Sequence, residues 1–355
     1  MGKIKEFLKR KNIEISAKRY GVDALGAMAQ GLFASLLIGT IVGTIGTQLD
    51  ISAFVTVGNF AKQSQVVGAA MACAIGWALQ CPPLVLFSLI TVGAASNEMG
   101  GAGGPLAVLI ITVISAELGK AVSKETKIDI LVTPFVTIFS GCMLSVLFAT
   151  HIAYIASSLG SIIIWATELQ PFLMGALVSA LVGIALTLPI SSAAICAALG
   201  LTGLAGGAAV AGCSAQMIGF AVMSFKENGV SGLISQGLGT SMLQMPNIVR
   251  NPRIWIPPTL ASIITGPIAT CIFKLEMNGA PVSSGMGTCG LVGQIGVYTG
   301  WLSPVNNAIA ITPSAFDWFG LILISFVLPA ILSVIFCILL KKIGWIGEND
   351  LKLDM

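Results

Sequence analysis

The feature that most constrains this chain is a succession of long apolar runs with almost no charges between them. The runs recur from about residue 24 to residue 340, and only 9% of the 355 residues are charged. Soluble domains carry about a quarter charged residues. Because a helix of about 20 apolar residues crosses the bilayer core, the pattern predicts an all-α polytopic membrane protein. No polar block is large enough to fold separately, so we expect one membrane transport domain over residues 23–341.

Ten of these runs have lengths that fit membrane-spanning helices. They lie near residues 24–47, 64–80, 82–96, 104–121, 130–153, 170–188, 190–204, 206–225, 255–273 and 316–340. The runs at 82–96 and 190–204 are the shortest, and each is also compatible with a re-entrant segment. The first run is a full span behind a long basic stretch, so we expect it to anchor the mature protein rather than to be cleaved as a signal peptide.

Residues 1–22 form a basic segment ahead of the first span. Its seven basic residues stand against two acidic ones, and they are Lys3, Lys5, Lys9, Arg10, Lys11, Lys18 and Arg19 against Glu6 and Glu14. Because such segments stay in the cytoplasm and are attracted to anionic lipid, we predict an amphipathic helix on the cytoplasmic surface. The alternative is a nucleic-acid-binding arm. Helical spacing partly gathers Phe7, Leu8 and other apolar residues on one face, which favours the membrane surface.

Basic residues farther along the chain indicate the orientation of the spans. They follow the fourth, eighth and last runs, and they are Lys120, Lys124, Lys127, Lys226, Arg250, Arg253, Lys341 and Lys342. All of them are cytoplasmic if the N-terminus is inside. The sequence therefore predicts a multi-pass protein of the inner membrane with both termini cytoplasmic and a short tail over residues 342–355.

Three stretches rich in glycine and small residues interrupt the spanning pattern. They are residues 97–105 (NEMGGAGGP), 189–216 and 278–296 (NGAPVSSGMGTCGLVGQIG). Irregular backbone at membrane depth survives where it is buried in protein or lines a cavity, and transporters use it to hold substrates near the midplane. We therefore expect re-entrant hairpins here. The alternative is that small residues merely allow close helix packing, and for residues 203–212 (GLAGGAAVAG) the two interpretations are evenly balanced.

Residues 226–258 mix apolar, amide and basic side chains with several prolines. This composition suits an amphipathic helix along the cytoplasmic surface, followed by an irregular, proline-stiffened lead into the ninth span. We expect this connector to join two packed bundles of helices.

Uncharged polar residues in these irregular stretches are the candidates for binding a solute. A neutral polyol needs amide and hydroxyl partners more than charges. The candidate set is Ser191, Ser192, Gln216, Gln244, Asn247, Asn251, Ser283, Ser284, Thr288 and Gln294.

Two ionisable residues in or near the spans are candidates for coupling or binding, because charges are expensive in a membrane. Glu117 lies near a cytoplasmic helix end, with Lys120 three residues on and within reach of an ion pair. His151 is the only histidine and lies near the outer end of the fifth span. The alternative for each is a structural role, as a paired or a hydrogen-bonded helix end.

Motifs for soluble catalysis are missing from the sequence. It has no P-loop, no HExxH, no nucleophile elbow and no CxxC among its eight cysteines. We therefore expect no enzyme activity, no cofactor and no metal site, and we interpret the cysteines as small packing residues.

Several segments resemble a known family of membrane proteins. MPNIVRNPRIWIPPTLASIITGP (245–267) is similar to the segment in membrane (IIC) components of the sugar phosphotransferase system where a Pro, an Asn-Pro and an Ile-Pro lead into a span. LTLPISSAAI, LAGGAAVAGCSAQMIGF and QGLGTSMLQMPNI resemble more specifically the branch that includes perfringolysin regulator-like proteins. The resemblance covers most of the chain.

The resemblance implies a glucose-superfamily IIC-like fold, in which a homodimer of about ten-span protomers has re-entrant hairpins and an elevator-like motion. In sugar permeases of this kind, a Glu just before the Pro/Asn-Pro segment and an upstream His bind the sugar and assist its phosphorylation by separate IIA and IIB proteins. Here residues 235–250 contain no acid, Gln244 is the nearest polar substitute, and no His follows residue 151. The chain therefore departs from the family pattern at both residues that assist phosphate transfer.

Two hypotheses of different classes follow. The first is a carrier for a sugar or another small polar solute, linked to the phosphotransferase proteins or acting alone. The second is a membrane sensor that binds a solute and signals through its basic N-terminal helix. Neither involves nucleic acid.

Overall fold

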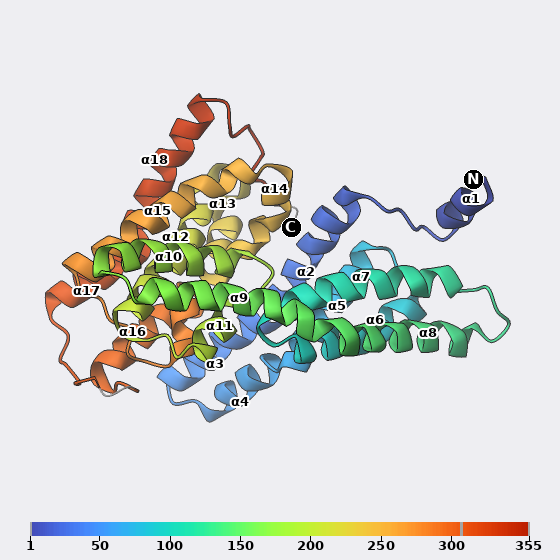
Figure 1. Cartoon of the computed structure of the whole chain (residues 1–355), viewed down its shortest axis with the longest axis horizontal. Coiled ribbons are helices and arrows are strands. Elements are labelled where there is room, and N and C mark those ends of the chain that lie inside the picture. The colour runs from blue at the N-terminus through green and yellow to red at the C-terminus, as the bar shows by residue number, and fades with distance from the viewer. Residues whose placement is uncertain (1, 306–307, 354–355) are drawn as a thin grey trace. The chain divides into compact units, whose positions relative to one another are not determined.

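The computed structural model describes residues 2–305 and 308–353, whose regular structure is helical (Figure 1). The chain divides into two compact units, Met1–Ile155 and Ala156–Met355. Helix α9 (Thr150–Thr167) contains the boundary between them.

The first unit begins with the short helix α1, which is followed by a long apolar helix. The long helix runs from Arg19 to Gln48 with two π-helical turns in it. Helices α5, α6, α7 and α8 pack against one another, and α2 packs on α5. The bounds are α1 (Gly2–Arg10), α2 (Ala24–Leu32), α3 (Ile38–Gln48), α4 (Ser52–Ala61), α5 (Ser64–Ala78), α6 (Pro83–Gly100), α7 (Gly104–Val122) and α8 (Asp129–Leu144).

The second unit is built around the buried helix α12, against which α10, α15 and α18 pack. Small residues on α12 permit this, because a Cβ on Gly207 or Gly212 would collide with the carbonyl oxygen of Leu275 or Ser179. The bounds are α10 (Pro171–Thr187), α11 (Ser192–Ala198), α12 (Gly203–Met223), α13 (Phe225–Ile234), α14 (Met245–Arg250), α15 (Ile256–Pro267), α16 (Val292–Leu302), α17 (Ala315–Ile322) and α18 (Leu328–Lys342).

The polytopic membrane architecture is confirmed, while the number of crossings stays a prediction. Over the described residues, six helical runs are long and apolar enough to cross a membrane, and they are Arg19–Gln48, Pro83–Val122, Asp129–Thr167, Gly203–Met223, Pro252–Ile272 and Ala315–Lys342. Shorter apolar helices cover Ser52–Ala61, Ser64–Ala78 and Pro171–Thr187. Within Pro83–Val122 the chain turns at Gly101, where φ is +48°, and α6 and α7 pack on each other.

Two of the expected spans have different bounds in the structure. The run at 190–204 contains the seven-residue helix α11 and the first two residues of α12. At 1.5 Å per residue α11 is about 10 Å long and cannot cross a bilayer. The re-entrant alternative for this run fits its length. The run expected at 130–153 continues to Thr167, because no proline follows Pro134 within it and Gly160 is tolerated inside the helix.

The Gly-rich stretch at 203–212 is regular helix, so close packing is the interpretation that the structure supports there. The expected amphipathic connector over 226–258 is more broken than predicted. Gly229 takes a positive φ inside α13, Thr240 is extended, and Pro246 and Pro252 each lie in the first turn of a new short helix.

Candidate solute site

The second unit brings two of the predicted irregular stretches together at α11. The Ser192 hydroxyl donates to the Gly285 carbonyl oxygen at 2.7 Å, and the Ser284 hydroxyl donates to the Leu201 carbonyl oxygen at 2.7 Å. Ser191 caps α11 by accepting from the Ala194 amide at 3.2 Å. Ser192 and Ser284 therefore link α11 and the residues just after it to the turn Pro281–Gly285, in which Ser283 is also buried.

Gln216 lies fully buried on α12, where both ends of its amide are occupied. Its Oε1 accepts from the Trp255 indole at 3.0 Å and from the Thr187 hydroxyl at 3.3 Å, and its Nε2 donates to the Thr259 hydroxyl at 3.1 Å. The Thr187 hydroxyl also lies 2.8 Å from that of Ser241. Gln216 therefore connects α10, α12 and the segment that leads into α15.

Three buried amides form a continuous line, which we call the amide chain: Gln236, Gln244 and Asn247. Gln244 Nε2 donates to Gln236 Oε1 and Asn247 Nδ2 donates to Gln244 Oε1, both at 2.9 Å. The Ser224 hydroxyl accepts from Gln236 at one end, and Arg250 donates to Asn247 at the other. Sequence reasoning missed Gln236, although it stands in the same irregular stretch as Gln244.

The amide chain binds the backbone that follows α18. The Leu351 carbonyl oxygen accepts from Gln244 Nε2 at 2.9 Å, and the Lys352 carbonyl oxygen accepts from Asn247 Nδ2 at 2.8 Å. Asn251 donates to the Asp350 carboxylate at 2.7 Å and to the Trp345 carbonyl at 3.0 Å. Gln244, Asn247 and Asn251 thus all bind the same protein segment, residues 345–352.

Gln294, in the first turn of α16, has an acceptor that is not in use. Its Nε2 donates to the hydroxyls of Ser214 at 3.2 Å and Ser325 at 3.0 Å. Its Oε1 is buried and accepts no hydrogen bond from the described residues. Thr288, in contrast, donates to the Gly237 carbonyl oxygen at 2.6 Å. Among the ten neutral candidates, Gln294 is the one whose side chain has a buried oxygen or nitrogen without a hydrogen-bond partner among the described residues.

A family model described as "Phosphotransferase system, EIIC" matches residues 22–353, which is most of the chain. The chain belongs to this EIIC family. It is therefore a membrane permease component of the phosphotransferase system. EIIC domains are transporter components, and the family implies separate IIA and IIB components and a solute. Searches of curated proteins and of solved structures each returned no match. The perfringolysin regulator-like branch stays a prediction.

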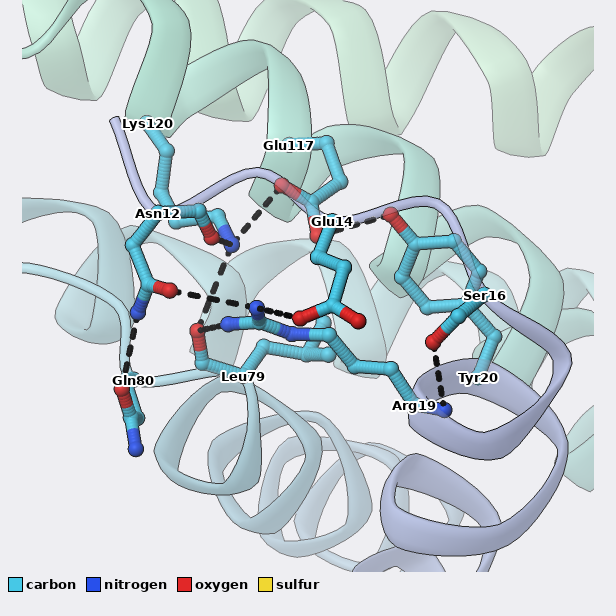
Figure 2. A network of polar contacts seen from close by, with 9 residues as sticks. All are labelled: Asn12, Glu14, Ser16, Arg19, Tyr20, Leu79, Gln80, Glu117 and Lys120. Carbon is cyan, nitrogen blue, oxygen red and sulfur yellow. Dashed lines mark hydrogen bonds and ion pairs between the residues drawn. The ribbon is translucent and has the colours of Figure 1, made fainter. Parts of the chain in front are cut away.

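The first unit of this EIIC chain holds the two ionisable candidates. Glu117 Oε2 lies 2.7 Å from Lys120 Nζ, which confirms the expected ion pair, and Glu117 Oε1 accepts from the Tyr20 hydroxyl at 3.0 Å (Figure 2). His151 is exposed, and its Nδ1 lies 3.0 Å from the Leu147 carbonyl oxygen one turn back. Both contacts agree with the structural alternative for these residues.

Lys120 links the N-terminal segment to the carboxyl end of α5 through hydrogen bonds. Its side chain is 1% exposed, and Nζ donates to the carbonyl oxygens of Asn12 at 2.9 Å and Leu79 at 3.3 Å. Arg19 Nη2 donates to the same Leu79 carbonyl at 2.8 Å (Figure 2). Because the carboxyl end of a helix is partially negative, two cations at the end of α5 stabilise it.

Cys81, in the turn between α5 and α6, provides a test of this packing. Burial raises the pKa of its thiol to about 12, although the nearby Lys120 acts in the opposite direction. At pH 8 about one thiol in 10⁴ is then ionised. We expect N-ethylmaleimide to label Cys81 very slowly at pH 8, and faster as pH rises, when followed by peptide mass spectrometry. Denatured protein is the control, and rapid labelling of folded protein would contradict the packing.

No three His, Cys, Asp or Glu side chains lie close enough to share a metal ion within residues 2–305 and 308–353. The eight cysteines are free thiols. The neutral candidates of the second unit offer hydrogen bonding by amides and hydroxyls.

Proposed function

We propose that this EIIC chain carries a neutral polar solute, a sugar, across the cytoplasmic membrane. The observation that supports the proposal best is the buried Gln294 Oε1, which has no donor among the described residues. A buried acceptor without a partner costs about 1–3 kcal/mol, and a solute hydroxyl that donates to it would recover that free energy. The other neutral candidates of the second unit complete the proposed site, from Ser191 and Ser192 to Thr288.

We do not propose that side chains of this protein take part in phosphate transfer. The amide chain stands where the resemblance would place an acid, and an amide has no charge with which to act as a base. We propose that any phosphorylation during transport depends on the separate IIA and IIB proteins. Uptake with and without those proteins distinguishes a linked permease from a plain facilitator.

An elevator-type motion is the second part of the proposal. The chain forms two compact units, and every neutral candidate lies in the second. This division suits a moving transport unit attached to a scaffold unit that forms a homodimer with both termini in the cytoplasm. Native mass spectrometry tests the dimer, and monomers alone would contradict it.

Uptake into proteoliposomes tests the function. Purified protein should accumulate at least one of ¹⁴C-glucose and ¹⁴C-mannitol, which stand for the hexoses and hexitols. Replacing Gln294 with leucine should lower the initial rate about tenfold, because a buried hydrogen bond of about 1.4 kcal/mol is lost. Gln65→Leu, at an exposed position on α5, is the matched control and should take up the solute at the wild-type initial rate.

The sensor hypothesis has its own signature in the same experiment. A sensor would bind one of these solutes, measured as a shift in melting temperature, without accumulating it. Binding without uptake in every lipid mixture would contradict the carrier proposal.

A further inference from the structure

The segment Gly344–Leu353, which we call the tail segment, returns along the second unit after α18. Gly344 takes φ +77°, which permits the turn. Ile346, Leu351 and Leu353 are buried, whereas Lys352 points to solvent. The segment is thus anchored by three apolar side chains, as a bound peptide would be.

The tail segment's backbone is bound largely by side-chain amides. Asn228 holds it at two points, because Nδ2 donates to the Leu351 carbonyl at 2.8 Å and Oδ1 accepts from the Leu353 amide at 2.8 Å. Gln244 and Asn247 bind the carbonyls of Leu351 and Lys352, as described above. No β-ladder ties the described part of the segment to its surroundings. It can therefore detach without breaking a sheet or helix.

The same donors are proposed to bind the solute. A peptide carbonyl and a sugar hydroxyl are both hydrogen-bond acceptors, and an amide N–H that donates to one is not available to the other. Gln244 and Asn247 are almost completely buried with the tail segment in place. A solute can reach their N–H groups only when this backbone leaves them.

We propose that the tail segment is a tethered plug that competes with the solute for the amide chain. This inference rests on the proposed function, because it requires Gln244 and Asn247 to bind the transported solute. Its occupant is a segment of this chain, and its effect is to lower the rate of transport until it is displaced.

A peptide experiment tests the docking without a solute. The chain ending at Ile343 should bind a fluorescein-labelled synthetic peptide of residues 344–353 saturably, measured by fluorescence anisotropy. The same peptide with Leu351→Asp should bind at least tenfold more weakly, because its buried anchor becomes charged. The peptide with Lys352→Ala is the matched control and should bind equally well, because that side chain is exposed.

An uptake experiment tests the competition. Full-length Leu351→Asp, checked for folding by its melting temperature, should take up ¹⁴C-glucose or ¹⁴C-mannitol about three- to tenfold faster than wild type, and Lys352→Ala should match wild type. Peptide supplied on both sides of the membrane should slow the chain ending at Ile343. If that chain does not fold, the full-length pair decides.

The outcomes separate this inference from the proposed function. Uptake by wild type with no effect of Leu351→Asp overturns the plug and leaves the carrier intact. No uptake by any variant, including Leu351→Asp, overturns both, even if the peptide binds. A peptide that fails to bind the folded shortened chain overturns the plug alone.

Discussion

Replacing Gly212 with valine should leave the second unit unable to fold. Gly212 lies on α12 where α10 and α15 meet it, and a Cβ there would overlap the Ser179 carbonyl group. The Ser262 hydroxyl, from α15, donates to the Gly212 carbonyl oxygen at 3.3 Å. The Ser179 hydroxyl, from α10, donates to the backbone carbonyl oxygen of Ser262 at 2.7 Å. An overlap with backbone cannot be relieved by a rotamer change, so three helices would have to separate.

Overpacking a well-packed core costs about 1–3 kcal/mol, and we expect Gly212→Val to exceed this range. Gly212→Ala should be intermediate. The measurement is the fraction of protein that stays monodisperse in mild detergent, together with its melting temperature.

Gly160→Ala is the matched control, since a Cβ there meets only the side chains of Leu199 and Ile195, at ordinary contact distances of 3.5 and 3.8 Å. It should melt at or above the wild-type temperature, because alanine favours helix over glycine. A normally folded Gly212→Val protein would show that α10 and α12 do not pack as described.

The sequence predicted most of the long helices, because one physical quantity, the thickness of the bilayer, sets the length of an apolar run that crosses it. It did not predict α4, a ten-residue helix between the first two expected spans, since so short a run is compatible with a loop. It also could not separate turn glycines from packing glycines. Gly212 lies inside a regular helix, whereas Gly287 takes φ +52° in an irregular turn, and both stand in similar runs of small residues.

The sequence indicated which types of polar side chain are the candidates, but not the groups to which they hydrogen-bond. The sequence indicated that amides near Gln244 matter, because so many neutral polar groups crowd one irregular stretch. The partners of Gln244 and Asn247 are carbonyls 107 and 105 residues away, and no local spacing encodes such contacts. Gln294 was predictable as a polar residue in a Gly-rich irregular stretch, whereas its unused acceptor depends on the positions of Ser214 and Ser325.

Removing the Lys120 ammonium should destabilise the first unit more than any other single charge change in it. Lys120→Met leaves the Glu117 carboxylate, 15% exposed, with the Tyr20 hydroxyl but with no cation of the described residues within 4 Å. It also removes a donor from the Asn12 carbonyl, so the N-terminal segment loses one of its attachments to α7. Breaking a buried pair by removing one partner costs about 3–5 kcal/mol. We expect a melting temperature lower by several degrees and faster proteolysis before Arg19.

The double variant Glu117→Gln with Lys120→Met distinguishes the effect of losing the lysine charge from the effect of changing the shape of its side chain. If Lys120→Met is less stable because it leaves an unpaired buried carboxylate, adding Glu117→Gln should restore a large part of the stability. Glu117→Gln alone should be destabilising, because it leaves the Lys120 charge buried without a partner. Lys124→Met, at an exposed position in the next turn, is the matched control and should be neutral. Equal stability of Lys120→Met and wild type would show that the pair is not buried in the membrane-embedded protein. The N-terminal segment would then be held by Arg19 and its bond to Leu79 instead.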